Sequence, residues 1–395
     1  MDKRRRTLYY TIGDNKEVYD FIKEQRIEKN FVCLKIEAEN MNCSYFDGGV
    51  TVAGRYSQSV SSESKNIAKI KIRHKMLFEE VIFVNGFGSS YKNILDLQEF
   101  AKSFFYELVI LIVDNNGFKT TEKKIKLLEC LDSGQYNFNY ERTSDCKSSF
   151  NHFLKTTEEL VVCANRFDKV FVFGDIHGCI EPLIDFENSN GFNNNELYVF
   201  LGDYFDRGLD NLEVLKFIIS HIDKENFVFI VGNHEKSIYR HFIKNEGANT
   251  FTKERYKEFR KGGFNDNQMM DMYNKMVMFY LIEFDGKKYM FNHGGICDKP
   301  DRSALETGFI YTNGNKSFDK QVDLEFQDNQ LMKNEKDRWI QVHGHRNQNF
   351  SCNLFNNQYS HSLECKIEFG GSLGIFIISR DGHKFKYIEN FKYSK

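Results

Sequence analysis

The amino-acid sequence predicts an α/β protein with two domains. Short apolar runs that end in glycine and a polar residue alternate with segments of helical periodicity, which is the pattern of strands and helices in a layered sheet. The chain has 395 residues, enough for two domains of ~100–200 residues each. The pattern is clearest from Lys169 onward, so this part carries the strongest fold signal.

Three apolar runs predict neighbouring strands at Lys169–Phe173, Glu196–Leu201 and Phe227–Val231. Between the last two, Asn211–Ile222 has apolar residues at helical spacing, with Asp210 and Asn211 as plausible caps. Glycine and a polar residue follow each run, and the carboxyl ends of such strands meet at one edge of a sheet. The sequence therefore predicts a functional site at that edge.

The later runs predict a second layer of strands. Met278–Phe284 and Lys288–Phe291 flank an Asp-Gly turn and form a hairpin, and Trp339–Val342 follows. In the tail, Lys366–Phe369 and Gly374–Ile378 are interpreted as antiparallel strands. These strands complete a β-sandwich.

The front of the chain predicts a smaller α/β domain. A polar stretch at 142–151 breaks the pattern, so we place the boundary before residue 167 and expect domains at 1–166 and 167–395. The predicted strands are Leu8–Ile12, Phe31–Ile36, Val81–Asn85 and Glu107–Asp114. The predicted helices are Glu17–Ile27 and Asn93–Phe105.

Composition excludes several classes of protein. The net charge is −2, which argues against non-specific attraction to nucleic acid or to an anionic membrane. No apolar window is long enough to span a bilayer, and the basic start lacks the apolar core of a signal peptide. The nine cysteines include no C-x-x-C pair. We therefore expect a reduced, cytoplasmic protein without a membrane partner.

The polar residues at the predicted strand ends form a set of carboxylates, an amide and imidazoles. Oxygen and imidazole donors together suit manganese, iron or zinc. Two such ions ~3.5–4 Å apart bind phosphoryl oxygens and lower the pKa of a water nucleophile. One such residue alone is more often a helix cap or a structural histidine. The set consists of Asp175, His177, Asp203, Asn233, His234, His293 and His345.

The surrounding motifs resemble the signatures of calcineurin-like metallophosphoesterases, in the same order along the chain. They are closest to the phosphoprotein-phosphatase branch. The motifs are Gly174–Gly178, Gly202–Gly208, Gly232–Glu235, His293–Gly295 and Gly344–His345. The resemblance implies a four-layer β-sandwich flanked by helices, and two divalent metal ions, with Mn²⁺ expected first and Fe, Zn or Ni as alternatives.

Ligand roles follow from the resemblance, residue by residue. It implies that Asp175, His177 and His345 hold the first metal. Asp203 would bridge both metals, and Asn233 and His293 would hold the second.

The resemblance also implies roles in catalysis and substrate binding. His234 would be the general acid, positioned by Asp206, and Arg207 would grip the phosphate. Lys236 and Arg240 follow on the next helix and could reach a substrate phosphate, although a solvated helix face is the alternative for Arg240. For His343, the roles of metal ligand, substrate contact and support for a ligand stay open.

The front domain resembles a P-loop kinase of the polynucleotide-kinase type. The likeness rests on Val81–Phe87, a helix at Tyr91–Phe105 and a strand at Glu107–Val113. The loop after the first strand, Gly13–Glu17, is not G-x-x-x-x-G-K-[ST], so the phosphate cradle is missing and ATP is not expected. We interpret 1–166 as a degenerate kinase-like domain that binds a partner or has a structural role; an unrelated α/β module is the alternative.

The leading hypothesis is a manganese-dependent phosphoesterase that acts on nucleotides or on RNA or DNA ends. The tail Ser362–Gly371 resembles that of phosphatases in polynucleotide kinase-phosphatases, which favours this substrate class. A phosphoprotein serine/threonine phosphatase is the first alternative. A partner- or nucleic-acid-binding protein with a secondary metal centre is the second. A protein partner would then bind through the front domain.

Overall fold

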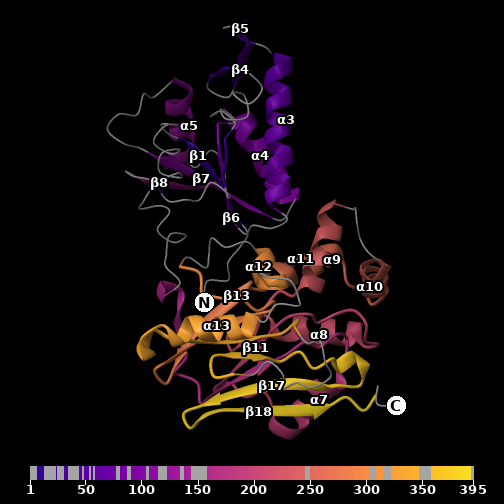
Figure 1. The fold of residues 1–395 in the computed structure, drawn as a ribbon. Helices are drawn as coiled ribbons and strands as arrows, with labels where there is room; N and C mark the ends of the chain where they lie inside the picture. The colour runs from indigo at the N-terminus through magenta and orange to yellow at the C-terminus, as the bar shows by residue number, and fades with distance from the viewer. Residues whose placement is uncertain are drawn as a thin grey trace. The chain divides into compact units, whose positions relative to one another are not determined.

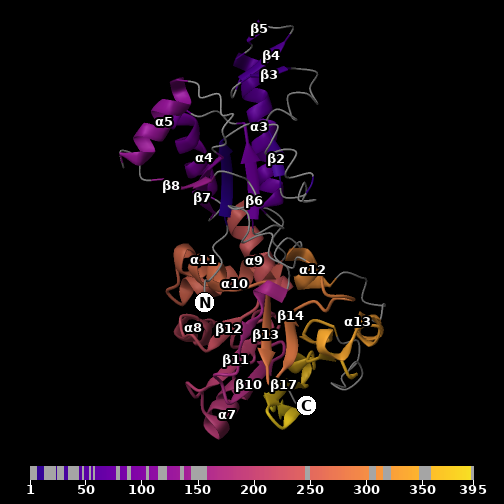
Figure 2. The ribbon, with the colours of Figure 1, turned by 90° about the vertical axis from the view of Figure 1, so that its left-hand side faces the viewer.

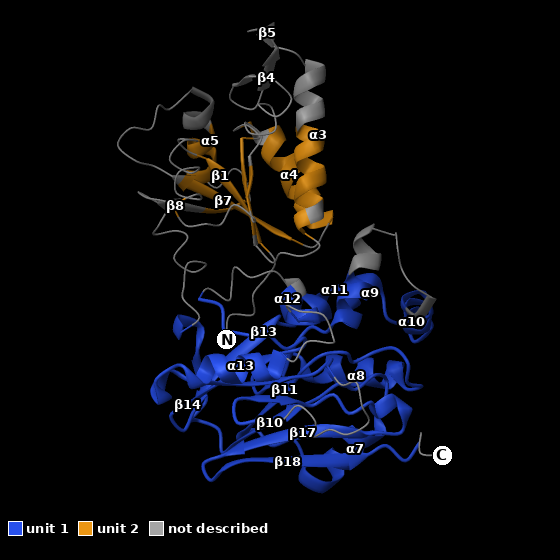
Figure 3. Cartoon of the chain, in the orientation of Figure 1, with its two compact units in different colours: residues 1–4, 156–301, 308–395 blue, residues 5–155, 302–307 orange. Residues whose placement is uncertain are grey.

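A computed structural model provides the structure of the chain. It describes residues 7–12, 24, 31–33, 44–46, 49–52, 55–56, 58–76, 81–86, 90–103, 106–113, 122–133, 138–143, 158–244, 250–301, 308–314, 322–346 and 357–392. The chain divides into two compact units (Figure 3). The C-terminal unit comprises residues 1–4, 156–301 and 308–395, and the N-terminal unit comprises 5–155 and 302–307.

The first sheet of the C-terminal unit carries the predicted parallel strands. Its order is β12-β11-β10-β17-β18. The parallel strands are β10 (Lys169–Phe173), β11 (Glu196–Phe200) and β12 (Phe227–Phe229), and β17 (Ser372–Ser379) and β18 (Gly382–Glu389) are antiparallel to their neighbours. These strands are rich in aromatic and β-branched residues, which pack well between layers. The Phe173 and Phe200 rings, for example, stack at 4.5 Å.

The second sheet of this unit has the order β16-β15-β14-β13-β9. Its strands are β9 (Val162–Cys163), β13 (Phe279–Phe284), β14 (Lys287–Asn292), β15 (Trp339–His343) and β16 (Ser360–Ser362). Since β9 pairs with β13, the segment before β10 belongs to this sheet. The two sheets form the predicted β-sandwich (Figures 1 and 2).

Helices flank the sandwich on both sides. Helix α7 contacts β17 and β18 of the first sheet, and α13 contacts β16 of the second, so the predicted four-layer architecture is confirmed (Figure 2). The helices of the unit are α7 (Glu181–Asn190), α8 (Asn211–His221), α9 (Asn233–Lys244), α10 (Thr250–Lys261), α11 (Asp266–Lys275), α12 (Gly308–Asn313) and α13 (Val322–Leu331), with short 3₁₀ turns η2 (Glu158–Leu160) and η4 (Glu335–Asp337).

One predicted strand of the tail was wrong. The segment Lys366–Phe369 is not a strand, and its last three residues form a 3₁₀ turn, η5 (Ile367–Phe369). Lys366 has φ 50° and Gly370 has φ 88°, so the backbone is left-handed on both sides of the turn. A left-handed residue ends an extended segment, and the strand therefore starts only at Ser372.

The N-terminal unit contains a parallel sheet with the order β2-β6-β1-β7-β8. Its strands are β1 (Thr7–Ile12), β2 (Phe31–Cys33), β6 (Val81–Asn85), β7 (Glu107–Val113) and β8 (Asn139–Thr143), and a separate small sheet holds β3 (Ser44–Phe46), β4 (Gly49–Val52) and β5 (Arg55–Tyr56). The helices are α3 (Gln58–Lys75), α4 (Tyr91–Ser103) and α5 (Glu122–Asp132).

The predicted strands of this unit are confirmed where the structure describes them, and β1 lies at the centre of the sheet. The predicted helix Glu17–Ile27 and the loop Gly13–Glu17 lie outside the described residues, apart from the single helical residue 24. No helix in the described part of the chain is long and apolar enough to cross a membrane.

Candidate metal centre

The candidate site lies where the strands of both sheets end. Five of its residues have left-handed backbone conformations, with φ between 44° and 73°: His177, Asp203, Asp206, Arg207 and His345. Non-glycine residues rarely adopt this conformation, and it persists only where the surrounding structure enforces it. Such strain is typical of functional sites, because it aims side chains that an ordinary turn would point elsewhere.

Two glycines allow the backbone to approach the carboxylates closely. A Cβ atom at Gly344 would lie 2.0 Å from Oδ1 of Asp175, and one at Gly232 would lie 2.2 Å from Oδ1 of Asp203. Both distances are far below van der Waals contact. These motif positions therefore require glycine for steric reasons.

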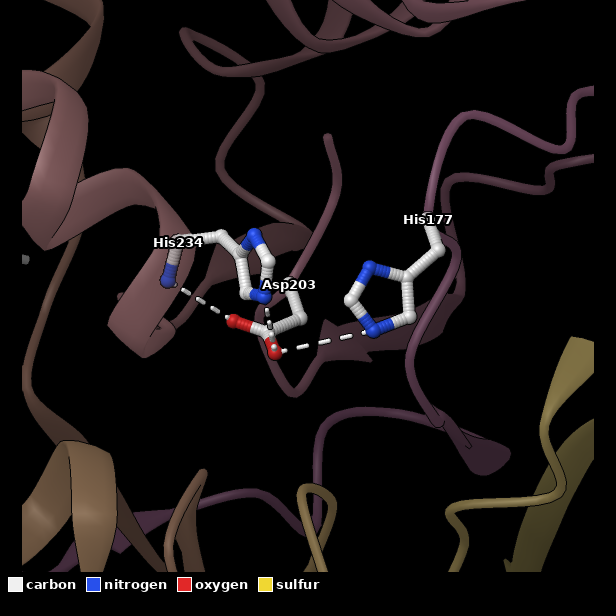
Figure 4. Close-up of side chains that lie close together, drawn as sticks. All are labelled: His177, Asp203 and His234. Carbon is white, nitrogen blue, oxygen red and sulfur yellow. Dashed lines mark hydrogen bonds and ion pairs between the residues drawn. The ribbon is translucent and has the colours of Figure 1, made fainter. Parts of the chain in front are cut away.

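The donor atoms of the predicted ligands converge. In three groups of side chains, all ligand atoms lie within 4.8 Å of one another. His177 Nε2 lies 3.7 Å from Oδ2 of Asp203, and His234 Nε2 lies 3.8 Å from the same oxygen (Figure 4). The groups are His177, Asp203 and His234; Asp203, His293 and His345; and Asp175, His177 and Glu364.

Asn233 completes this cluster from the start of α9. Its side-chain amide lies 3.0 Å from Nε2 of His293. The other ring nitrogen of His293 lies 2.9 Å from the Leu201 carbonyl, which fixes the ring. A backbone carbonyl in this position selects the tautomer that leaves Nε2 as the donor for a metal.

The electrostatics of the cluster fit a cation. Burial and the nearby Glu364 carboxylate hold the pKa of Asp175 well above its usual range. Burial also opposes ionisation of Asp203, but the imidazoles of His293 and His234 outweigh it and hold its pKa well below the usual range. Buried carboxylates that crowd one another are stable as anions only near positive charge. The oxygen and imidazole donors therefore fit divalent metal ions.

Burial keeps two histidines of the cluster, His345 and His177, in the neutral form that a metal ligand needs. Burial lowers the pKa of His345 to about 3 and also lowers the pKa of His177. The Nδ1 atom of His177 lies 3.1 Å from the Phe205 carbonyl, so its Nε2 faces the cluster. A neutral imidazole with one nitrogen held by a carbonyl presents its lone pair to a metal.

Glu364 is a candidate ligand that the sequence did not single out. It lies with Asp175 and His177 in one of the three converging groups and is buried. Glu364 belongs to the tail segment Ser362–Gly371, and this position is the sequence feature that could have identified it as a candidate ligand. A lone glutamate after a short polar run carries no pattern of its own.

Glu235 is a second residue that the sequence analysis missed. Its buried carboxylate accepts hydrogen bonds, each of 2.9 Å, from the backbone N–H groups of Asp203, Tyr204 and Gly232. Burial raises its pKa to about 7. Glu235 thus joins the loop after β11 to the loop after β12 and fixes the position of Asp203.

His234 and Asp206 form the predicted pair. Nδ1 of His234 lies 2.7 Å from Oδ2 of Asp206. The other oxygen of Asp206 faces Nε of Arg255 at 3.7 Å, and neither of these two atoms has a hydrogen-bond partner among the described residues. Arg255 comes from α10 and is also paired with Glu258. No motif marked Arg255, because a helix rich in charge usually faces solvent.

Arg207 lies beside these histidines. Its Nη1 atom is 2.9 Å from Nε2 of His177, and its Nη2 atom is 3.4 Å from Nε2 of His234. Nη1 also donates a 2.7 Å hydrogen bond to Oε1 of Glu368, which the sequence analysis did not identify. The arginine side chain remains 41% exposed, so it can still contact a ligand.

The other three predicted substrate contacts, unlike Arg207, are not seen as exposed side chains at the cluster. His343 is buried, with Nε2 2.8 Å from Asp323 and Nδ1 2.9 Å from the Gly344 carbonyl. Both ring nitrogens are therefore engaged, and the geometry favours support for the loop that carries His345. Lys236 is only 3% exposed and does not face solvent. The side chain of Arg240 lies outside the described part of the chain.

A two-sheet sandwich with carboxylates, an amide and imidazoles at one edge is the fold and site of a metallophosphoesterase. The family comparison agrees: the sequence model of the calcineurin-like phosphoesterases matches residues 168–370. The chain belongs to this metal-dependent family.

Curated relatives are similar to shorter stretches of the chain. A bis(5'-nucleosyl)-tetraphosphatase of Oceanobacillus iheyensis is 29% identical over 131 residues, which are 29% of this chain and 52% of that protein. The serine/threonine-protein phosphatase PP1-delta of Caenorhabditis elegans is 35% identical over 130 residues, which are 32% of this chain and 39% of that protein. The chain thus spans about half, or less, of the length of these relatives. A solved serine/threonine phosphatase from Saccharomyces cerevisiae is 15% identical, and the match covers 57% of this chain and 80% of that one with a TM-score of 0.38.

Proposed function

We propose that the protein is a binuclear metal-dependent phosphoesterase that acts on nucleotides or on the end phosphates of nucleic acids. The observation that carries this proposal is the convergence of His234, Asp206 and Arg207 on the buried carboxylate and imidazole cluster. The cluster supplies donors for a metal, and the other three residues supply a proton and a positive charge.

In the proposed centre, Asp175, His177 and His345 would hold one ion, Asn233 and His293 would hold the other, and Asp203 would serve both. Glu364, which converges with Asp175 and His177, would be a further donor for the first ion. When bound, such ions polarise the phosphoryl group and lower the pKa of water. We propose Mn²⁺, with Fe, Zn or Ni as the alternatives.

The protein's own groups then handle the leaving oxygen. Asp206 holds Nδ1 of His234, which leaves Nε2 to carry the proton that the leaving oxygen receives. Arg207 projects a half-exposed guanidinium next to this nitrogen. A guanidinium there can bind the phosphate oxygens and stabilise the charge that develops on them.

A nucleotide substrate is supported by an exposed aromatic residue that neighbours Glu368 in the chain. Phe369 is 61% exposed and directly follows Glu368, which contacts Arg207. An exposed aromatic ring can stack on a nucleobase, and Phe369 is a candidate for this role. The Oceanobacillus relative, by its name, acts on a dinucleoside tetraphosphate, and this supports the same class of substrate.

The alternative is a phosphoprotein serine/threonine phosphatase. The 35% identity to the Caenorhabditis elegans phosphatase supports this candidate. A partner-binding protein with a secondary metal centre is less well supported. A chain without catalysis has no need for His234, Asp206 and Arg207 beside a full set of metal donors.

A parallel assay of the manganese-loaded full chain distinguishes these functions. The substrates are an RNA 3′-phosphate, a 2′,3′-cyclic phosphate, a cyclic dinucleotide and a phosphoserine peptide. We expect turnover of at least one nucleotide substrate well above turnover of the peptide. Selective turnover of the peptide would instead establish the phosphatase alternative, and no turnover of any substrate would contradict an enzymatic role.

For the front of the chain, we propose a degenerate kinase-like domain at 1–166 that binds a partner or has a structural role. The parallel sheet with β1 at its centre is compatible with this proposal. Calorimetry of the full chain with ATP tests it. Binding of ATP at micromolar affinity would contradict the proposal.

A further inference from the structure

We propose that buried Glu368 tunes the charge preference of the phosphate subsite, shifting it away from doubly charged phosphomonoesters and toward singly charged phosphodiesters. This inference rests on the proposed phosphoesterase function. It concerns a residue outside the metal-ligand set and assigns it a role in substrate specificity.

The geometry places Glu368 beneath Arg207. Oε1 of Glu368 accepts a 2.7 Å hydrogen bond from Nη1 of Arg207. The glutamate side chain is 1% exposed and the arginine side chain is 41% exposed. The carboxylate therefore holds the guanidinium from the protein interior, while the outer side of the guanidinium stays open to a ligand.

The backbone around Glu368 holds the carboxylate in this position. Glu368 lies in the 3₁₀ turn η5, between the left-handed residues Lys366 and Gly370. Ile367 anchors the turn, since it is 1% exposed and its carbonyl accepts a 3.1 Å hydrogen bond from Asn390. A short turn fixed on both sides does not swing aside when a ligand arrives. Glu368 therefore remains next to Arg207 when a phosphate binds.

The charges explain the preference. An arginine without an anionic neighbour attracts a phosphomonoester dianion more strongly than a phosphodiester monoanion. Glu368 places a negative charge on the inner side of the same guanidinium, which reduces that difference. Arg207 is the cation that is hydrogen-bonded to this carboxylate through Oε1, and Oε2 of Glu368 has no hydrogen-bond partner among the described residues. A phosphate on Arg207 thus interacts with a nearly neutral pair.

The test compares two aryl esters with the manganese-loaded full chain. For wild type and variants, kcat/KM is measured on an aryl phosphate, a dianion, and on a bis-aryl phosphate, a monoanion. We expect Glu368→Gln to raise the ratio of monoester to diester activity about tenfold, which corresponds to ~1.4 kcal/mol. Glu368→Asp retains the charge, so we expect its ratio to stay close to that of wild type even if both activities fall.

Glu196→Gln is a matched control. Glu196 is also a buried glutamate of the same unit, but it begins β11, at the opposite end of the strand from Asp203, and accepts a hydrogen bond from Tyr198. We expect this variant to keep the wild-type ratio. If Glu368→Gln does not unfold cooperatively, Glu368→Met replaces it, because methionine fills a similar volume without charge.

The outcomes separate the two levels of the hypothesis. An unchanged ratio in Glu368→Gln, with both activities reduced equally, would mean that Glu368 only positions Arg207, and the inference would be wrong. A ratio shifted toward the diester would also contradict it. Wild-type protein that hydrolyses neither ester would overturn the proposed function itself.

Discussion

At the scale of single residues, the two nitrogens of His234 have different environments. Nδ1 lies 2.7 Å from Asp206, whereas Nε2 lies near Asp203 and Arg207. The aspartate therefore fixes the ring and leaves Nε2 for proton transfer. The same logic applies to the proposed metal ligands, where backbone carbonyls hold one nitrogen each of His177 and His293.

Removal of the His234 imidazole tests the proton-transfer role. We expect His234→Ala to lower kcat on an aryl phosphate by roughly 10²–10⁴-fold, the usual contribution of general acid catalysis. Manganese content, measured by elemental analysis, should stay close to that of wild type. The control is His221→Ala, a histidine of α8 outside the site. A His234 variant with normal turnover would contradict the assignment.

Arg255 offers a sharper test of how the pair is positioned. Its Nε atom faces Asp206 at 3.7 Å, so it helps to hold the carboxylate that orients His234. We expect Arg255→Gln to reduce kcat several-fold while KM and metal content change little. Arg260→Gln is the control, because Arg260 lies on the same helix and pairs with exposed Asp266. Equal effects of both variants would show that α10 acts only through its stability.

The metal ligands and catalytic residues that sequence reasoning proposed lie in glycine-rich motifs. Asp175, Asp203 and His293 were predictable because glycine and a polar residue follow an apolar run, and a sheet gathers such ends. Glu368 and Arg255 were not predictable in this way. Their roles arise from contacts across 161 residues for Glu368 and Arg207, and between helix α10 and the loop after β11 for Arg255.

At the scale of elements, periodicity predicted buried strands well and exposed or irregular ones poorly. The runs that became β10, β11 and β6 are almost wholly apolar, so their burial fixes their conformation. Strand β8 (NYERT) was missed because its polar alternation resembles a loop. The 3₁₀ turn at 367–369 was mistaken for a strand because hydrophobicity does not report a left-handed residue such as Lys366.

Strand β16 carries a buried histidine that should make stability depend on pH. His361 is 2% exposed and packs against Phe376 at 4.8 Å and Phe385 at 5.4 Å. Burial lowers its pKa to about 3. In the unfolded chain it binds a proton below pH ~6.5, whereas in the folded chain it stays neutral. The unfolded state therefore binds more protons between these values, and stability falls as pH falls through this window.

When the pH falls from 7.5 to 5, we expect His361 to lower the free energy of unfolding by about 2 kcal/mol. The loss is ~1.4 kcal/mol for each pH unit below ~6.5, the pKa of histidine in the unfolded chain. His361→Phe removes this titration and keeps the apolar contacts. Urea unfolding at both pH values measures the loss for each protein. Other titrating groups contribute to both proteins, so the difference isolates His361. Equal losses would contradict the pKa assignment.

At the scale of the whole molecule, the proposed metal centre draws its ligands from both sheets of the sandwich. Its donors come from the loops after β10, β11, β14 and β15, and from α9, so bound ions would link elements of both sheets. Without ions, crowded buried carboxylates such as Asp175 and Glu364 oppose folding. The N-terminal unit has its own sheet and contributes none of the ligands proposed for the centre.

Metal removal should therefore destabilise the C-terminal unit selectively. A ligand that binds only the folded state raises the free energy of unfolding by ~2.7 kcal/mol when its concentration is one hundred times its Kd. We expect chelation to lower the melting temperature of a transition reported by Trp339, the single tryptophan of the chain, which is buried in β15. Added Mn²⁺ should restore it. Asp203→Asn should abolish this dependence, because the variant loses the carboxylate proposed to bridge both ions. If neither chelator nor manganese changed the melting temperature of wild type, the cluster would fold without a cation. Buried carboxylates such as Asp175 would then have to be protonated in the folded state.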